Sequence, residues 1–190
     1  DNINCAFYDL DSDRIIESLE QKSNDIDVRL VSDNSNRFDL NKLDFVKYDD
    51  KKQLMHNKFC ILNQGNENIV FTGSLNPTKN GLEKNENNLA VITSNLIAEN
   101  YQLEFNELWN LNFGKGENVK YPKINFNGFV MENYFCPEDN CEEKVLNLIQ
   151  DSKNRIYFMT FSFTSDPLGD LIIEKSQTVE VKGLFEKFQN

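Results

Sequence analysis

The sequence predicts an α/β protein in which two similar halves follow each other along the chain. Short apolar runs typical of strands alternate with amphipathic segments typical of helices, and this alternation favours a sheet with parallel strands. A stretch near the N-terminus also recurs near the C-terminus, which indicates an internal duplication. The longest apolar runs cover about four residues. They are far shorter than the ~20 residues that a membrane-spanning helix needs.

The first part of the chain contains most of the predicted strands. Short apolar or alternating runs predict them at 3–8, 26–32, 43–47, 56–63, 68–74 and 88–94. Ser12 or Asp13 is suited to cap a first helix, which lies between the first two strands. The segment 33–42 reads as a loop with room for a short helix, and a long amphipathic helix is predicted at 96–111. These elements alone are enough for one sheet with helices packed on it.

The alternation then restarts after a break. Residues 113–128 contain several Gly, Lys and Asn and read as a linker. Strands are predicted beyond it at 130–135, 155–161 and 179–185, and helices at 140–152 and 166–176. We therefore divide the chain into 1–113 (most of a first half), 114–129 (a linker) and 130–190 (the start of a second half).

A displacement of 153 residues, without gaps, aligns segment 3–36 with segment 156–189. Six of the 34 aligned pairs are identical, and most other strand positions agree in apolar character. The first copy lacks counterparts of 130–152, and the second stops where the counterpart of 37 onward would begin. We therefore expect the chain to be a slice from the middle of a two-copy protein.

Charge and histidine content restrict the function. Twenty basic against 31 acidic residues give a net charge of −11. This argues against a protein that coats nucleic acid non-specifically, although an enzyme with a small basic cleft is compatible with it. His56 is the one histidine in the sequence, so chemistry that needs two imidazoles must take the second from elsewhere. No group of carboxylates or imidazoles has metal-ligand spacing, and we expect neither a metal nor a cofactor.

Two short segments carry the residues suited to catalysis. His56-Asn57-Lys58 lies on one predicted strand, and Gly73-Ser74-Leu75-Asn76 ends the next. His56 and Lys58 are two positions apart, so on a strand they project from the same face. An ammonium can hold the non-bridging oxygens of a phosphate while a neighbouring imidazole attacks phosphorus. Ser74 and Asn76 add neutral hydrogen-bond donors. On its own, an HxK segment also fits an ordinary strand-end histidine beside a solvated lysine.

The combination of HNKFCILN, GSLN and the duplication resembles the phospholipase D superfamily, which is named for an HxK(x)4D motif followed by GSxN. His56, Lys58, Ser74 and Asn76 match that pattern position by position. The later segments YFCPEDN and RIYFMTFSFTSD resemble the beginning of the family's second half. The resemblance implies a mixed sheet flanked by helices, in two similar halves around one active site. It also implies that one histidine bonds covalently to phosphorus, while the other protonates the leaving group and then activates water, without a metal.

Some positions depart from this pattern. The motif's aspartate, a supporting residue in the family, is Asn63 here, which keeps the shape and loses the charge. Families of this kind often place a carboxylate after GSxN to orient the nucleophilic imidazole. Glu86 is the nearest carboxylate, whereas the register puts Asn87 at that position, and both stay open as supporting residues. By the displacement of 153, the second HxK is expected near position 209.

The four cysteines fall into two pairs of different character. Cys136 and Cys141 are separated by four residues, so they can close a small disulfide loop, remain free thiols or bind a metal. Cys5 and Cys60 lie within apolar strand runs and are most simply thiols of the core.

We therefore expect a phosphodiesterase that works through a phosphohistidine intermediate at His56, with a metal-independent nuclease as the leading form. One alternative is a phospholipase D or a cardiolipin-type hydrolase or transferase. Another is a catalytically impaired module that binds phosphodiesters, as Asn63 and the missing second histidine would allow. The expected partners are a phosphodiester substrate, nucleic acid before phospholipid, and a second active-site half. That half would come from a C-terminal segment or from a homodimer partner, so the 190-residue chain is expected to be inactive as a monomer.

Overall fold

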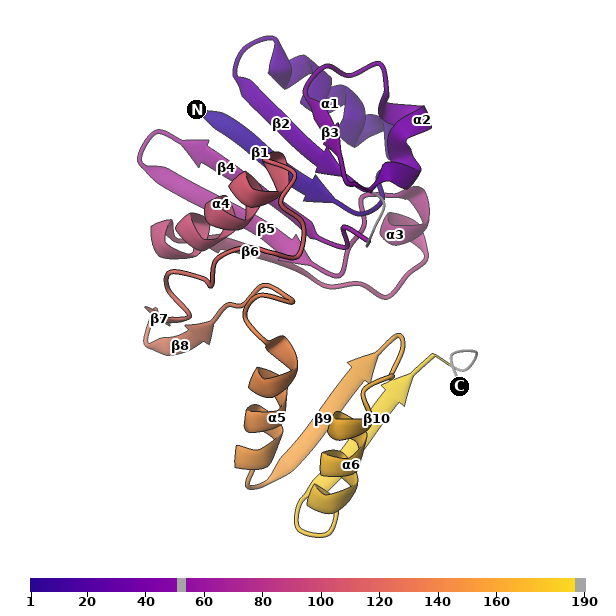
Figure 1. Cartoon of the computed structure of the whole chain (residues 1–190), viewed down its shortest axis with the longest axis vertical. Coiled ribbons are helices and arrows are strands. Elements are labelled where there is room, and N and C mark those ends of the chain that lie inside the picture. The colour runs from indigo at the N-terminus through magenta and orange to yellow at the C-terminus, as the bar shows by residue number, and fades with distance from the viewer. Residues whose placement is uncertain (51–53, 187–190) are drawn as a thin grey trace. The chain divides into compact units, whose positions relative to one another are not determined.

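The computed structural model describes residues 1–50 and 54–186 (Figure 1). These residues form two compact units, Asp1–Glu138 and Asp139–Asn190, which we call unit 1 and unit 2. Unit 1 contains the HxK and GSxN segments. Unit 2 contains the second copy of the repeated stretch.

Unit 1 is built on a six-stranded sheet with the order β3-β2-β1-β4-β5-β6. The strands are β1 (Asn2–Phe7), β2 (Asp27–Ser32), β3 (Val46–Tyr48), β4 (Lys58–Gln64), β5 (Glu67–Gly73) and β6 (Leu89–Thr93). β1 and β3 are parallel to β2, whereas β4 is antiparallel to β1, and β5 and β6 continue antiparallel. The prediction of parallel strands is therefore wrong for β4–β6. The connection at 65–66 is a tight turn, and a parallel pair would need a crossover of a dozen or more residues.

The helices of unit 1 lie where the sequence predicts them, with short additions. They are α1 (Asp13–Ser23), the 3-10 turn η1 (Asn34–Asn36), α2 (Arg37–Leu40), α3 (Lys79–Glu83) and α4 (Asn95–Trp109). Ser12 is the N-cap residue of α1, although its side chain makes no capping hydrogen bond. Side-chain caps occur at α3, where Thr78 accepts from the Gly81 N–H, and at α4, where Ser94 accepts from the Ile97 N–H.

Apolar side chains leave the sheet on both faces and form two cores. On one face, Phe59 and Ile61 of β4 pack beneath Phe105 of α4 in a first cluster. On the other face, Cys5 of β1 and Leu19 of α1 belong to a second cluster. Because side chains alternate along a strand, Lys58, Cys60 and Leu62 of β4 point away from α4. Lys58 therefore shares a face with the second cluster.

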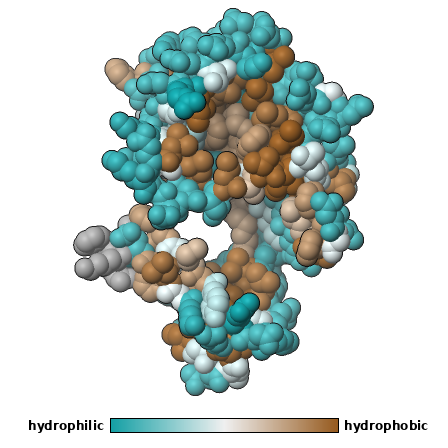
Figure 2. Space-filling view, turned by 180° about the vertical axis from the view of Figure 1, so that it is seen from behind, coloured by the Kyte–Doolittle hydropathy of each residue, from teal (hydrophilic) through white to brown (hydrophobic). Residues whose placement is uncertain are grey.

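Within the described ranges, part of the sheet face that carries the second cluster lies outside both core clusters. Alternation along β4, β5 and β6 brings five apolar side chains to it, and the register places them side by side. Leu89 is 54% and Val91 is 59% exposed, and Figure 2 shows a broad hydrophobic area on unit 1 seen from behind the view of Figure 1. We call this area the open sheet face. It comprises Leu62, Ile69, Phe71, Leu89 and Val91.

The segment expected to be a linker contains a hairpin, β7 (Lys123–Phe126) and β8 (Phe129–Glu132). Asn100 of α4 ties it to unit 1: its side chain donates to the Tyr121 carbonyl and accepts from the Tyr121 N–H, at 2.8 and 3.0 Å. Ile124 is buried in the first core cluster. Residues 114–129 are therefore packed as part of unit 1.

Unit 2 contains α5 (Cys141–Asp151), β9 (Arg155–Thr160), α6 (Asp166–Lys175) and β10 (Glu180–Phe185). β9 and β10 are parallel, and their six residue pairs run from Arg155–Glu180 to Thr160–Phe185. The six pairs between β1 and β2 run from Asn2–Asp27 to Phe7–Ser32, which is the same register displaced by 153 residues. The repeated stretch thus forms the same strand–helix–strand element twice, with Ser165 as the N-cap residue of α6 as Ser12 is of α1.

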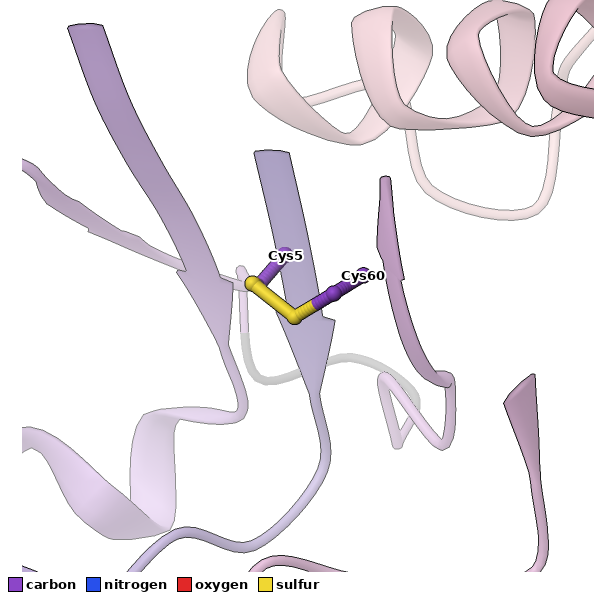
Figure 3. Close-up of a disulfide and its surroundings, with 2 residues drawn as sticks. All are labelled: Cys5 and Cys60. Carbon is purple, nitrogen blue, oxygen red and sulfur yellow. A yellow bond between two sulfur atoms is a disulfide. The ribbon is translucent and has the colours of Figure 1, made fainter. Parts of the chain in front are cut away.

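The cysteines correct one expectation. Cys5 and Cys60 are not core thiols: they form a disulfide that joins β1 to β4 (Figure 3). They are directly opposite in the antiparallel register, which places their side chains on one face. Each strand taken alone shows only an apolar run, so this pairing is not visible in the sequence. Cys136 and Cys141 are disulfide-bonded as well.

No helix among residues 1–50 and 54–186 is both long and apolar enough to span a membrane. Across the same ranges, no three His, Cys, Asp or Glu side chains gather where they could hold a metal ion.

Candidate active site

The predicted catalytic segments meet at one edge of the unit 1 sheet. β1 ends at Phe7, which is paired with Lys58 at the start of β4. Phe59 is paired with Thr72, so β5 ends beside the same point. The loop after β5 is joined to the loop after β1, since the Ser12 N–H donates to the Pro77 carbonyl at 3.1 Å. Fold topology thus brings the HxK segment, the GSLN segment and residues 8–12 to one edge.

His56 and Lys58 lie in direct contact there. His56 is exposed and precedes β4, whereas Lys58 is its first residue and is half-buried. The Lys58 ammonium donates to the His56 carbonyl at 2.8 Å and lies 5.0 Å from the centre of the Tyr8 ring. The His56 imidazole is 4.5 Å from the same ring, measured between ring centres. The two predicted catalytic groups therefore share Tyr8 as a neighbour.

The electrostatics of the edge favour an uncharged imidazole. Burial and the Lys58 charge lower the pKa of His56, and Asp33 opposes them more weakly. Burial also lowers the pKa of Lys58, from 10.5 to about 8, against the attraction of Asp9. Burial and the repulsion of Asp11 raise the pKa of Asp9. A neutral imidazole is the form that carries a nucleophilic lone pair, so His56 is suited to attack an electrophile near neutral pH.

The GSLN segment supplies a compact backbone and two polar side chains. A Cβ at Gly73 would lie 2.3 Å from the Asn88 carbonyl oxygen, so the approach of β5 to β6 requires glycine there. The Ser74 hydroxyl accepts from the Asn88 N–H and donates to the Asn87 side chain, both at 3.0 Å. Asn76 is half-buried, and its side-chain oxygen is buried without a hydrogen-bond partner among the described residues. This oxygen is an acceptor, so the amide nitrogen of Asn76 is the group that could donate to a phosphate oxygen.

The supporting residues fall at different places. Asn87 joins the site through Ser74, and its amide also donates to the Gly81 carbonyl at 3.0 Å. Glu86 is exposed in the same loop. Asn63 lies near the other end of β4, where its amide donates to the Asn2 side chain at 2.6 Å. It lies five positions further along the strand than Lys58, which is roughly 17 Å at the rise of an extended chain. The structure therefore does not bring Asn63 to the site.

Tyr8 and Asp9 are the site residues that sequence reasoning missed. They follow β1, and Asp9 interacts electrostatically with Lys58. The displacement of 153 aligns Asp9 with Ser162, but 28 of the 34 aligned pairs differ, so the sequence held no signal that singles out Asp9.

A known protein family matches the part of the chain that contains both motif segments. Residues 1–109 match the family described as cardiolipin synthase, PLD-like domain. That match covers more than half of the chain, including both motif segments. This chain belongs to the phospholipase D-like family.

Curated relatives match only over parts of their length. The mitochondrial cardiolipin hydrolase of Xenopus laevis is 34% identical over 64 residues, which are 34% of this chain and 29% of that protein. The protein of the same name from Chlamydomonas reinhardtii is 26% identical over 115 residues, which are 56% of this chain and 50% of that protein. The chain thus spans half or less of each of these phospholipase D-like relatives.

A solved structure agrees with the fold. Nuc from Salmonella typhimurium, a phospholipase D family member, superposes with a TM-score of 0.50 at 24% identity, over 58% of this chain and 78% of Nuc. This likeness shows the α/β fold with its mixed sheet, as the sequence resemblance implied. It does not bear on the duplication.

The two shifted pKa values predict the pH dependence of turnover. In the role expected from the sequence, Lys58 would hold phosphate oxygens only as an ammonium, so activity should fall as the pH rises through about 8. His56 would attack only when neutral, and its pKa is lowered, so the acidic limb should lie below the ordinary 6.5. Profiles of kcat/KM against pH measure both limbs. In Lys58→Arg, whose guanidinium stays charged, the alkaline limb should move up even if overall activity drops. An alkaline limb that stays in place in this variant would contradict its assignment to Lys58.

Proposed function

We propose that the protein is a phosphodiesterase in which His56 forms a covalent phosphohistidine intermediate. The observation that carries this proposal is that an imidazole with a lowered pKa and a partly buried ammonium lie against the same Tyr8 ring, at the sheet edge where the GSxN segment also ends. The imidazole nitrogen forms a bond to phosphorus, and the bond from phosphorus to the leaving oxygen breaks. Lys58 and the amide of Asn76 bind the non-bridging oxygens, where negative charge accumulates.

The departing oxygen must receive a proton in this step. A second imidazole supplies it and then takes a proton from the water that attacks phosphorus, which releases His56 and the phosphate product. His56 is the one histidine of this sequence, so the second imidazole must belong to another half. Our proposed partners for this half are the two expected from the sequence: a further C-terminal segment with an HxK near position 209, or a second copy of the chain.

Two features support a two-half architecture. The strand register of β1/β2 recurs in β9/β10 at a displacement of 153 residues, which is what a duplicated half would preserve. The open sheet face also begins beside Lys58 and leaves Leu89 and Val91 more than half exposed. Exposed apolar areas of this kind commonly mark an interaction surface, and a half docked there would reach the site edge.

We keep nucleic acid as the leading substrate class and phospholipid as the second candidate. The small nucleases of the family are expected to have two plain halves without large insertions, and the described part of unit 1 is similarly spare, which favours a nuclease. Phospholipid is favoured by the relatives from Xenopus laevis and Chlamydomonas reinhardtii, both called mitochondrial cardiolipin hydrolase. The motif binds the phosphodiester itself, so the site residues do not choose between these substrates. A phosphodiester-binding module without turnover is the remaining alternative.

One experiment separates these functions. The protein is incubated in EDTA with plasmid DNA, with single-stranded RNA, and with vesicles that contain cardiolipin. We expect cleavage of one substrate class, because Lys58 and Asn76 meet the phosphate charge without a metal. Loss of activity in EDTA that added Mg²⁺ restores would contradict the mechanism and indicate metal-dependent hydrolysis. Binding without cleavage, in a form that contains two histidine-bearing halves, would support the binding module instead.

A further inference from the structure

Tyr8 contacts both predicted catalytic groups, although it belongs to neither motif. Its ring centre is 4.5 Å from that of His56, with the two ring planes inclined by 54°. The Lys58 ammonium lies 5.0 Å from the same ring, within the range of a cation–π interaction. The Tyr8 N–H also donates to the Asn57 carbonyl at 2.8 Å, so the backbone beside the ring is bonded to the middle residue of the HxK segment.

We propose that Tyr8 is a positioning residue that holds His56 and Lys58 in their relative arrangement for the attack on phosphorus. The inference rests on the proposed function and adds a residue to its site. A lysine side chain has four rotatable carbons, and an exposed imidazole turns about two bonds, so neither keeps one orientation unaided. A single ring in contact with both groups restricts both of them. Covalent attack depends on such alignment, because a small misplacement of the reacting groups slows the reaction strongly.

Tyr8 also contributes to the environment in which His56 stays neutral. The ring displaces water from one side of the imidazole, and burial is the largest cause of the lowered His56 pKa. The charged groups that act on the pair come from three elements: Lys58 and Asp33 act on His56, and Asp9 acts on Lys58. Asp9 is in turn influenced by Asp11 and Asp33. Removal of the ring leaves these charges in place, so a change in the His56 pKa would report the loss of burial.

The test uses the fact that His56 is the one histidine of the sequence. Its ring protons can be followed by NMR in the intact chain without turnover. In Tyr8→Ala we expect the His56 pKa to rise toward its ordinary value, and the ring-current shift of the imidazole protons to disappear. Tyr8→Phe keeps the aromatic face and should keep both signals. Tyr8→Leu keeps much of the side-chain volume without the aromatic ring. It replaces Tyr8→Ala in these measurements if the alanine variant does not fold.

Turnover gives the second measurement. In an active form of the protein, Tyr8→Ala should lower kcat by about tenfold or more with a smaller change in KM, and Tyr8→Phe should restore most of it. Tyr48→Ala is the matched control, since Tyr48 lies at the end of β3 and faces Arg37 instead of the catalytic pair. This control should leave the His56 signals and pKa unchanged.

The outcomes separate this inference from the proposed function. Unchanged His56 signals in Tyr8→Ala, or a phenylalanine variant that behaves like the alanine variant, would overturn the positioning role. Tyr8-dependent His56 signals in a protein that hydrolyses its substrate without His56 would instead overturn the proposed nucleophile and leave the contact established.

Discussion

Replacement of His56 by asparagine should abolish phosphodiester hydrolysis and leave the fold intact. In the proposed mechanism the imidazole is the group that bonds to phosphorus, and removal of a covalent nucleophile typically costs on the order of 10⁴-fold or more in turnover. Asparagine is polar and small, and His56 is exposed ahead of β4, so the expected loss of unfolding free energy is under ~0.5 kcal/mol. Initial rates and thermal unfolding of the parent and the variant measure the two effects separately.

Chemical modification provides an independent control for this prediction. Diethyl pyrocarbonate acylates histidine, so in this sequence its histidine product is confined to His56. Acylation should stop turnover of a homodimer of this chain, whose histidines are all His56, and hydroxylamine, which removes the acyl group, should restore it. A parallel trapping experiment should find phosphate attached to the peptide that contains His56. An asparagine variant that keeps more than a few per cent of the parent's turnover would rule out His56 as the nucleophile.

The residues of the candidate site that the sequence indicated belong to single short segments of the chain. The spacing of His56 and Lys58 and the small residues of GSLN are local patterns, and the fold places both segments at one sheet edge. The second strand–helix–strand stretch was also recognisable in the sequence, because strand register follows the alternation of apolar residues and does not require identical residues. The register of β9/β10 accordingly equals that of β1/β2 after a displacement of 153 residues.

Features that depend on pairing between distant strands were not predictable in the same way. Cys5 and Cys60 each read as an ordinary core residue, and only the antiparallel register of β1 and β4 brings them into a disulfide. The role of Tyr8 likewise arises because β1 and β4 are neighbours. For Asn63 the prediction from sequence was wrong. Its position in the motif predicted a supporting residue at the site, whereas the extended strand β4 places it roughly 17 Å from Lys58.

The second large effect concerns the missing imidazole. A monomer of residues 1–190 should turn over at least ~10²-fold more slowly than a form that contains two histidine-bearing halves. The factor is the contribution of general acid catalysis to the departure of the leaving oxygen, which is typically 10²–10⁴-fold. Sedimentation and activity measured over the same range of chain concentrations test this. If two copies supply the pair, activity per chain should rise with the dimer fraction. If a longer polypeptide supplies both halves, activity per chain should be independent of concentration.

The open sheet face offers a more specific test of where the second half docks. Val91→Glu places a charge on this face, where Val91 is 59% exposed, so it should not disturb the core of unit 1. A docked half would have to bury that charge without a partner, and turnover should fall toward the level of a single half. Val130→Glu is the matched control: it makes the same substitution on β8, at a side chain that is 70% exposed. If both variants keep full activity, the second half does not dock on the open sheet face. If a sedimenting monomer with His56 as its only histidine turns over as fast as the two-half form, the leaving oxygen receives its proton from a group other than a second imidazole.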